Sequence, residues 1–471
     1  MNKIKALLAA IVFVLSVASV CDAINVIYVD VNGPNDPGSG SYTDPFRRIQ
    51  DAIDAANNDD IIEIRPGIYT GAGNYDLDPN DKSISVRSVN PDDAGVVANT
   101  IIDPNNAGRG FYIHDGEDAN RIISGLTIRN AYTTTEYDGA GIYCFNGSLT
   151  VHNCVIQDGY AEGSGGGICC NSSIVTIINC TITGNTADYY GGGISCVFCA
   201  PLITGCTISN NTASREGGGI DSGESDPNIL NCIIFGNNSI VGGGINCYFR
   251  GSANLVNCTI AANSADNVGG GVYCWTKGSV TIENSILWAN WSIDGAQLGL
   301  EEEGTASVSY CDIQGGQTGI YNPCGLLVWG AGNINNDPCF ASFDPNGNPD
   351  LWDFHLQSEY GRWKPDSQSW VIDSNTSPCI DAGDTNSNWT AEPWPNGKRI
   401  NIGAYGGTNQ ASKNGNPADF NIDGVVNFQD FALLANKWMV EGSFIEDLNL
   451  DGVVEFEDLR LFADNWLWQR E

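Results

Sequence analysis

A glycine-rich tripeptide followed by a β-branched residue occurs six times in this chain at nearly constant spacing. The branched residues stand 26, 26, 26, 25 and 27 positions apart, and they are Ile142, Ile168, Ile194, Ile220, Ile245 and Val272. A sequence period in this range is typical of stacked repeat proteins, in which each repeat buries the apolar face of its neighbour. The repeat therefore predicts an elongated solenoid, whose function must lie on its surface or in attached segments.

Within each repeat the apolar residues alternate by two. In the run Asn179-Cys180-Thr181-Ile182, the Cys and Ile side chains point to one face of a strand and Thr points to the other. A second strand follows the glycines, as at 194–196, and a third, such as 174–178, closes the coil. Helical repeats would instead need apolar residues three and four positions apart. The pattern predicts an all-β fold, specifically a right-handed parallel β-helix.

Two columns of cysteine follow from this register. The first contains Cys154, Cys180, Cys206, Cys232, Cys258 and Cys311, and the second contains Cys144, Cys170, Cys196, Cys247 and Cys274, with Ser285 and Ser222 filling gaps. Neighbouring strands lie about 4.8 Å apart, so distance alone leaves disulfides open. Parallel side-chain directions disfavour them, and we expect reduced, buried thiols. Zinc is disfavoured because the cysteine spacing is that of the coil and the chain has three His.

An asparagine column accompanies the cysteines. Its members are Asn185, Asn211, Asn237, Asn263 and Asn290. We expect these residues to occupy tight corners in the left-handed backbone conformation, which Asn tolerates, and to form hydrogen bonds along the column. A ligand-binding stripe is the alternative interpretation.

The N-terminus and the net charge indicate where the protein functions. Residues 1–23 carry Lys3 and Lys5, an apolar run over 6–20 and then Cys21-Asp22-Ala23, which is typical of a bacterial secretion signal. No later stretch is apolar enough to predict a transmembrane segment in the mature chain. The net charge of −35 argues against nucleic acid and anionic membranes as partners. We expect a secreted, extracellular or cell-surface protein, in surroundings where Ca²⁺ is abundant.

The composition divides the mature chain into three parts. Residues 24–410 are predicted to form the β-helix, with a short capping helix near 45–56, regular coils over about 121–315 and an irregular cap over about 316–410. A linker at 411–416 leads to a small module at 417–471. We expect the Trp- and Pro-rich cap to cover the second open end of the core.

The β-helix part resembles secreted bacterial proteins of the pectate-lyase-like superfamily. The resemblance rests on Tyr28-Val29-Asp30, the capping helix and Arg65-Pro66-Gly67-Ile68-Tyr69, and the coils are similar to the Gly-Gly-x-Ile repeats of polymorphic outer-membrane proteins. The runs 377–383 and 401–407 resemble the terminal segment of exported β-helix proteins of the choice-of-anchor type. The superfamily includes lyases, glycosidases, epimerases and adhesins, so the resemblance implies a fold without deciding an activity.

The C-terminal module contains two twelve-residue loops, 28 residues apart, with the spacing of calcium ligands. Oxygen donors occupy positions 1, 3, 5, 9 and 12, a carbonyl group occupies position 7, and glycine makes the sharp turn at position 6. The predicted ligands are Asp419, Asn421, Asp423, Val425, Asn427 and Asp430 in the first loop, and Asp447, Asn449, Asp451, Val453, Glu455 and Asp458 in the second. Each loop leads into an amphipathic helix. Ca²⁺ is therefore the predicted cofactor.

This pair of loops resembles a dockerin module, over about 417–471. As dockerins favour, position 12 is Asp in both loops, and positions 10 and 11, which help dockerins choose partners, are Phe428-Gln429 and Phe456-Glu457. The resemblance implies calcium binding and a cohesin-like partner, while a structural or cell-surface attachment role stays open.

Catalytic residues cannot be assigned from the coils. No outward stripe combines basic residues with acids, as a lyase would need, and the candidates for a glycosidase pair are Asp158, Glu162, Asp188, Glu216 and Asp221. Outward aromatics fit sugar binding better, and they are Tyr143, Tyr189, Tyr190, Tyr273 and Trp275. His114, His152 and His355 form no visible set, and the run 344–350 reads as a polar turn more than a calcium site.

The sequence therefore predicts a secreted, calcium-binding β-helix protein, tethered through its C-terminal module, that binds polysaccharide or a surface partner in carbohydrate utilisation. The alternative is a polysaccharide lyase or glycoside hydrolase carried by the same module.

Overall fold

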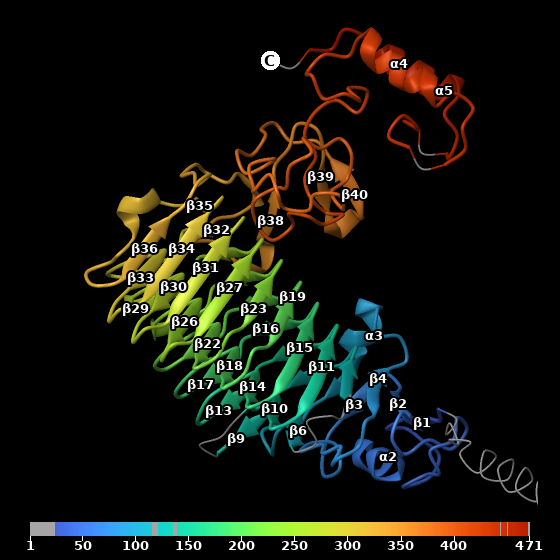
Figure 1. The fold of residues 1–471 in the computed structure, drawn as a ribbon. Coiled ribbons are helices and arrows are strands. Elements are labelled where there is room, and N and C mark those ends of the chain that lie inside the picture. The colour runs from blue at the N-terminus through green and yellow to red at the C-terminus, as the bar shows by residue number, and fades with distance from the viewer. Residues whose placement is uncertain (1–23, 115–120, 135–138, 443, 450, 470–471) are drawn as a thin grey trace, which may run out of the picture.

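A computed structural model describes residues 24–114, 121–134, 139–442, 444–449 and 451–469 (Figure 1). The predicted secretion signal at 1–23 lies outside the described residues. Within the described ranges, no helix combines the length and apolar character that crossing a membrane requires.

The coils stack into a right-handed parallel β-helix, as the repeat predicted. Successive coils contribute strands to four parallel sheets that run along the stack (Figure 1). The first sheet consists of β1 (Val26–Val29), β2 (Ile61–Ile64), β4 (Ser85–Ser88), β7 (Arg121–Ser124), β11 (Ser148–His152), β15 (Ile174–Ile178), β19 (Leu202–Thr204), β23 (Asn228–Leu230), β27 (Ser252–Val256), β31 (Ser279–Glu283), β34 (Thr305–Ser309) and β36 (Leu326–Trp329).

The second sheet follows the first, after a short turn in most coils. It consists of β3 (Gly67–Tyr69), β5 (Thr100–Ile102), β8 (Thr127–Arg129), β12 (Val155–Gln157), β16 (Thr181–Thr183), β20 (Thr207–Ser209), β24 (Ile233–Phe235), β28 (Thr259–Ala261), β32 (Ile286–Trp288) and β35 (Asp312–Ile313).

The third and fourth sheets complete the coil. The third consists of β6 (Phe111–His114), β10 (Ile142–Phe145), β14 (Ile168–Asn171), β18 (Ile194–Val197), β22 (Ile220–Gly223), β26 (Ile245–Tyr248), β30 (Val272–Cys274) and β33 (Leu298–Leu300). The narrow fourth sheet consists of β9 (Tyr132–Thr133), β13 (Tyr160–Ala161), β17 (Thr186–Ala187), β21 (Thr212–Ala213), β25 (Asn238–Val241) and β29 (Ser264–Val268).

The cysteine columns point inward and are reduced, as predicted. Each cysteine in the described part of the chain is free. In the first column the thiols serve as both acceptors and donors: the backbone N–H of Cys180 donates to Sγ of Cys206 (3.4 Å), and Sγ of Cys180 donates to the carbonyl oxygen of Ile178 (3.2 Å). Buried thiols therefore stabilise neighbouring coils without a covalent link.

The asparagine column is confirmed, but its backbone conformation was predicted wrongly. Asn211 is fully buried, and its amide nitrogen donates to Oδ1 of Asn237 and to the carbonyl oxygen of Ile182, both at 2.9 Å. The left-handed conformation is adopted instead by a second set of residues, at the turn before the first cysteine column and its gap-filling Ser285: Asn153, Asn179, Asn231, Asn257 and Asn284. Their side chains face outward, whereas the column residues need their amides inside the coil.

The tripeptide glycines are required by close packing between coils. Gly191 has a positive φ of 63°. A Cβ atom on Gly192 would lie 2.6 Å from the carbonyl oxygen of Gly218, and one on Gly193 would lie 2.6 Å from that of Gly219. A side chain at Gly192 or Gly193 would therefore clash with the next coil, which accounts for glycine at these two positions.

The N-terminal end of the core is covered by α2 (Ile49–Ala55), within the range expected for a capping helix. Its buried residues Ile49, Ala52 and Ile53 join the core of the coils. A second helix, α3 (Ala94–Asn99), was not predicted from the sequence, because it is short and only Val97 among its residues is buried.

The segment after residue 316 divides into two parts. The 3₁₀ helix η1 (Gly316–Gly319) and β36 lie at the end of the stack, where Ile320, Leu327 and Trp329 pack against the core. Residues from about 340 onward lie along the side of the coils instead (Figure 1, orange). Their elements are β37 (Phe340–Ser342), η2 (Pro349–Leu351), β38 (Asp353–Leu356), β39 (Arg362–Lys364), η3 (Pro365–Ser367) and β40 (Ser369–Val371).

This lateral segment, residues 340–410, packs on the outer face of the second sheet through an apolar cluster that includes Phe354 and Ile402 on one side and Ile286 on the other. The outward turn asparagines hold it in place. Asn231 donates from Nδ2 to the carbonyl oxygens of Ala404 (3.0 Å) and Gly406 (2.8 Å). The run 401–407 therefore serves to dock this segment onto the coils.

Residues 411–416, predicted to be a linker, are packed against the lateral segment. Ser412 donates from its hydroxyl to the carbonyl oxygen of Leu356 (2.6 Å). The next residue, Pro417, is also held by the lateral segment, because its carbonyl oxygen accepts from Nε1 of Trp394 (2.9 Å). The C-terminal module, with helices α4 (Phe428–Asn436) and α5 (Phe456–Asp464), is thus attached by an ordered connection.

We predict that Asn211→Ala destabilises the coils by about 2 to 4 kcal/mol, because it leaves buried donors and acceptors on two neighbouring coils without partners. Chemical denaturation followed by circular dichroism measures the change. The control is Asn228→Ala, which removes an exposed amide from β23. Equal stability of the two variants would contradict a structural role for the column.

Candidate functional site

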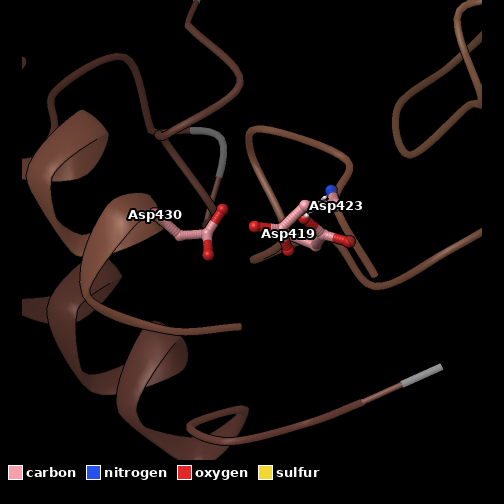
Figure 2. A group of neighbouring side chains, drawn as sticks. All are labelled: Asp419, Asp423 and Asp430. Atoms are coloured by element: carbon pink, nitrogen blue, oxygen red, sulfur yellow. Dashed lines mark hydrogen bonds between the residues drawn. The ribbon is translucent and has the colours of Figure 1, made fainter. Parts of the chain in front are cut away.

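The first predicted calcium loop, residues 419–430, brings three of its candidate ligands together. Asp419, Asp423 and Asp430 each offer a carboxylate oxygen, and these oxygens all lie within 4.8 Å of one another. Figure 2 shows Asp430, on α4, facing Asp419 and Asp423 across the loop. Asp419 and Asp430 are buried, whereas Asp423 is exposed. Hard oxygen ligands converging on one point form the donor set that Ca²⁺ prefers.

Backbone N–H groups hold these carboxylates in position. Gly424 donates to Oδ2 of Asp419 (2.9 Å), and Asn421 donates to Oδ1 of Asp430 (3.1 Å). Asn427 caps α4 by accepting from the N–H of Gln429 (2.8 Å). The loop is therefore preformed, with oxygen atoms left facing its centre.

The second loop repeats this framework 28 residues further on. Gly452 donates to Oδ2 of Asp447 (2.8 Å), and Asn449 donates to Oδ1 of Asp458 (3.1 Å). Gly424 and Gly452 share a positive φ, 86° and 95°, at the sharp turn. The remaining predicted ligands lie on the same loops: Asn421, Val425 and Asn427 in the first, and Asp451, Val453 and Glu455 in the second.

Charge repulsion is built into the first loop. Burial, together with the nearby Asp430 and Asp423 carboxylates, raises the pKa of Asp419 above its ordinary value. A bound cation would remove this penalty. The residues present therefore fit a Ca²⁺ ion in both charge and donor chemistry.

The other suggested cation site is a turn. Asp344 and Asp350 are exposed, and Oδ1 of Asp344 accepts from the N–H of Asn346 (3.0 Å). This geometry matches the polar turn that the sequence favoured. Among the histidines, His355 is buried against Tyr405 with ring centroids 3.6 Å apart, and its ring nitrogens are within hydrogen-bonding distance of Asp353 and Gln410.

On the coils, the structure joins two of the five acids suggested as a glycosidase pair. Glu216 and Asp221 each accept a 2.9 Å hydrogen bond from Nδ2 of Asn246. Their accepting oxygens are therefore less than about 6 Å apart, which is close enough for the two acids to be considered as a glycosidase pair. Asp188 and Glu162 lie elsewhere, where each accepts from a tyrosine hydroxyl, that of Tyr160 (2.8 Å) and Tyr132 (2.6 Å) respectively.

Asp221 is nevertheless closed to substrate. It stands on the outward side of β22 between Ser195 and Asn246 on the adjacent coils, yet it is 0% exposed. The hydroxyl of Tyr248 would lie 2.6 Å from a Cβ atom on Gly223, so this glycine lets the ring lie close over the strand. A side chain without solvent access cannot act on a bulky glycan.

Burial also controls the charge of this pair. It raises the pKa of Asp221 well above its ordinary value, and the pKa of Glu216 is raised for the same reason. Oδ2 of Asp221 makes no hydrogen bond within the described chain. A neutral carboxyl at this position resolves the cost of burying it.

Aromatic side chains form a continuous strip over the third sheet, here called the aromatic strip: Tyr190, Tyr248, Phe249, Tyr273 and Trp275. Trp275 stacks on Tyr248 with ring centroids 5.9 Å apart. Tyr143 and Tyr273, expected to be outward sugar-binding residues, are 6% and 5% exposed. Phe249 was not singled out from the sequence, but it is 50% exposed.

Asn246 and Tyr248 were also missed by the sequence reasoning. The register was the available signal, because Ser195, Asp221 and Asn246 stand at equivalent positions of three successive repeats. Aligning this outward column would have placed the acid beside the amide. This outward column is buried, however, because the Tyr248 and Trp275 side chains are large and lie over it. The alternation of inward and outward residues along a strand does not predict such cover.

Comparisons with known proteins agree with the fold. Residues 67–221 and 118–287 match the family described as "Right handed beta helix region", and residues 313–383 match the family described as "Disaggregatase related". No curated protein sequence matches the chain. Pectate lyase Pel9A is similar in structure, with a TM-score of 0.51 and 17% identity over 83% of this chain and 97% of that one.

A rhamnogalacturonan lyase also resembles the chain, with a TM-score of 0.31 and 14% identity over 68% of this chain and 91% of that one. This second likeness is too weak to carry an argument. The first shows a shared right-handed β-helix.

We predict that Asp221→Asn raises the stability of the coils at pH 7 by about 1 kcal/mol or more. The folded pKa of Asp221 is raised, so its contribution to stability is greatest below the unfolded pKa of about 4 and falls as the pH rises. Melting curves from pH 4 upward should diverge from wild type as the pH increases. Asp266→Asn, an exposed control on β29, should leave the curve unchanged, and parallel curves for Asp221→Asn would contradict the prediction.

Proposed function

We propose that this is a secreted, calcium-binding β-helix protein that is tethered through residues 417–471 and binds polysaccharide in carbohydrate utilisation. The observation that carries the proposal is the convergence of Asp419, Asp423 and Asp430 in a loop whose framework recurs in the second repeat. Such paired loops are suited to a small module that folds around Ca²⁺ and presents its helices to a partner.

The surface of the module supports an attachment role. Phe428 and Phe456, at equivalent positions of the two repeats, are each 76% exposed. Each ring lies edge-on to a tryptophan of the other repeat: Phe428 to Trp466 at 4.9 Å and Phe456 to Trp438 at 5.1 Å between centroids. Exposed aromatics in such an arrangement are typical of protein-binding surfaces. A cohesin-like or cell-surface protein is the partner that we propose.

Polysaccharide binding is proposed for the coils. The chain shares its fold with a pectate lyase, and aromatic rings border the third sheet. Polysaccharide lyase or hydrolase activity is the alternative function. The acid pair Glu216–Asp221 is its best candidate, but Asp221 has no exposed surface. We therefore favour binding over catalysis.

Calcium binding has a stoichiometric test. We predict that the exported chain binds two Ca²⁺ ions by isothermal titration calorimetry, that Asp430→Ala and Asp458→Ala each leave one, and that the double variant leaves none. Added Ca²⁺ should raise the melting temperature of the wild type and not that of the double variant. Asp464→Ala, on the exposed face of α5, is the matched acidic control. Binding that survives in the double variant would refute the loops as the sites.

Binding without cleavage has a second test. We predict that the chain with Ca²⁺ is retarded in native gels containing a polysaccharide that it recognises, while ultraviolet absorbance and reducing-end assays detect no product. Unsaturated products would establish β-elimination, and reducing ends alone would establish hydrolysis. Either result would replace the binding function with the enzymatic alternative.

A further inference from the structure

A hollow of about 620 Å³ lies where the turns after the third sheet lead into the first sheet. Four successive turns line it, and its side chains include Asn146, Ser172, Phe198 and Glu224, one from each turn. Ile174, which is 68% exposed, adds an apolar surface. Neighbouring coils are about 4.8 Å apart, so the hollow extends about 14 Å along the stack.

Phe198 has a backbone conformation that its side chain does not favour. Its φ is 51°, and the residues at the same turn position include Asn146, Ser172, Glu224 and Phe249, with φ between 48° and 51°. This left-handed region suits Asn and is unfavourable for a bulky residue. The Phe198 ring is 57% exposed, so core packing does not account for it. A strained, exposed aromatic residue points to a binding role.

A second phenylalanine repeats the arrangement two coils later. Val197 pairs with Gly223 and Gly223 pairs with Tyr248, so Phe198 and Phe249 lie two coil spacings apart, about 10 Å. Phe249 joins the aromatic strip through Tyr248 and Trp275, with ring centroids 5.1 and 6.2 Å away. This spacing is close to the length of one disaccharide in an extended glycan chain. Flat rings at that interval suit the apolar faces of alternate sugars.

The negative charge of the hollow favours an uncharged polysaccharide over an acidic one. Its charged lining residues are Glu224 and Asp226, and none of its lining residues is basic. Carboxylates accept hydrogen bonds from sugar hydroxyls, but they repel the carboxylate or sulfate groups of an acidic polysaccharide. The net charge of −35 adds to this repulsion. An uncharged glycan avoids both penalties.

We propose that these turns bind an uncharged polysaccharide chain lying along the axis of the stack. Phe198 and Phe249 stack on sugar faces, and Glu224 accepts hydrogen bonds from hydroxyl groups between them. This inference rests on the proposed function and specifies its site and ligand class.

The test uses Phe198→Asn and Phe249→Asn in the exported chain with Ca²⁺. Because Asn146 already occupies the same turn position with a φ of 49°, asparagine should fit there without loss of stability. We expect melting temperatures at or above that of wild type. Affinity for a neutral glycan should fall at least about tenfold in each variant. Trp291→Ala is the control, because Trp291 is 56% exposed but follows the second sheet, away from these turns.

The probes are xyloglucan, galactomannan and mixed-linkage β-glucan, against polygalacturonate and alginate, in affinity gels at low and high salt. Retardation by a neutral probe that persists from about 0.05 to 0.5 M NaCl supports the inference, because stacking is not screened. Retardation by acidic probes alone would overturn the ligand class. Unchanged affinity in both asparagine variants would overturn the site. Both of these results leave the proposed function standing, whereas wild type that binds no polysaccharide refutes both.

Discussion

The structure depends on satisfying polar groups along the stack without water. Along the strands, the backbone N–H and C=O groups of each coil form hydrogen bonds with the next coil. At the corners, the backbone alone cannot satisfy all of these groups. The asparagine column completes it: Asn211 accepts from both the backbone and the side chain of Asn185, at 3.0 Å, and donates to Asn237. A buried amide that is bonded on both sides costs little, whereas an unpaired one is expensive. The column therefore fixes the register of the coils that carry it.

A fixed register determines what the surface can do. In the regular coils, each outward position recurs on the next coil, so residues 25 to 27 positions apart become neighbours. This brings Asp221 beside Asn246, and it repeats the left-handed turn that presents Phe198 and Phe249. An outward position on the coils can be buried, as at Asp221, or exposed, as at Phe198. The size of the adjacent side chains determines whether it is buried. Tyr248 closes over the acid, while the small Ser172 leaves the hollow beside Phe198 open.

The fold could be predicted from the sequence because Gly191, Cys180 and Ile182 each belong to a period that few architectures share. The convergence of Asp419, Asp423 and Asp430 could be predicted because the spacing of these candidate ligands is encoded within twelve residues. The predictions that were wrong or missing concern features that depend on contacts between residues distant in sequence. The backbone of Asn185 was predicted to be left-handed, but its inward amide excludes that choice. The docking of Ile402 on Ile286 joins residues more than a hundred positions apart, and no local pattern specifies it.

The position of the lateral segment keeps the C-terminal module away from the proposed glycan site on the coils. It packs on the outer face of the second sheet, and it holds the module through Ser412 and Trp394. The hollow beside Phe198 lies at the turn between the third and first sheets, which is the corner of the coil opposite that face. With this arrangement, the proposed partner on α4 and α5 would leave the turns beside Phe198 open to the proposed glycan chain.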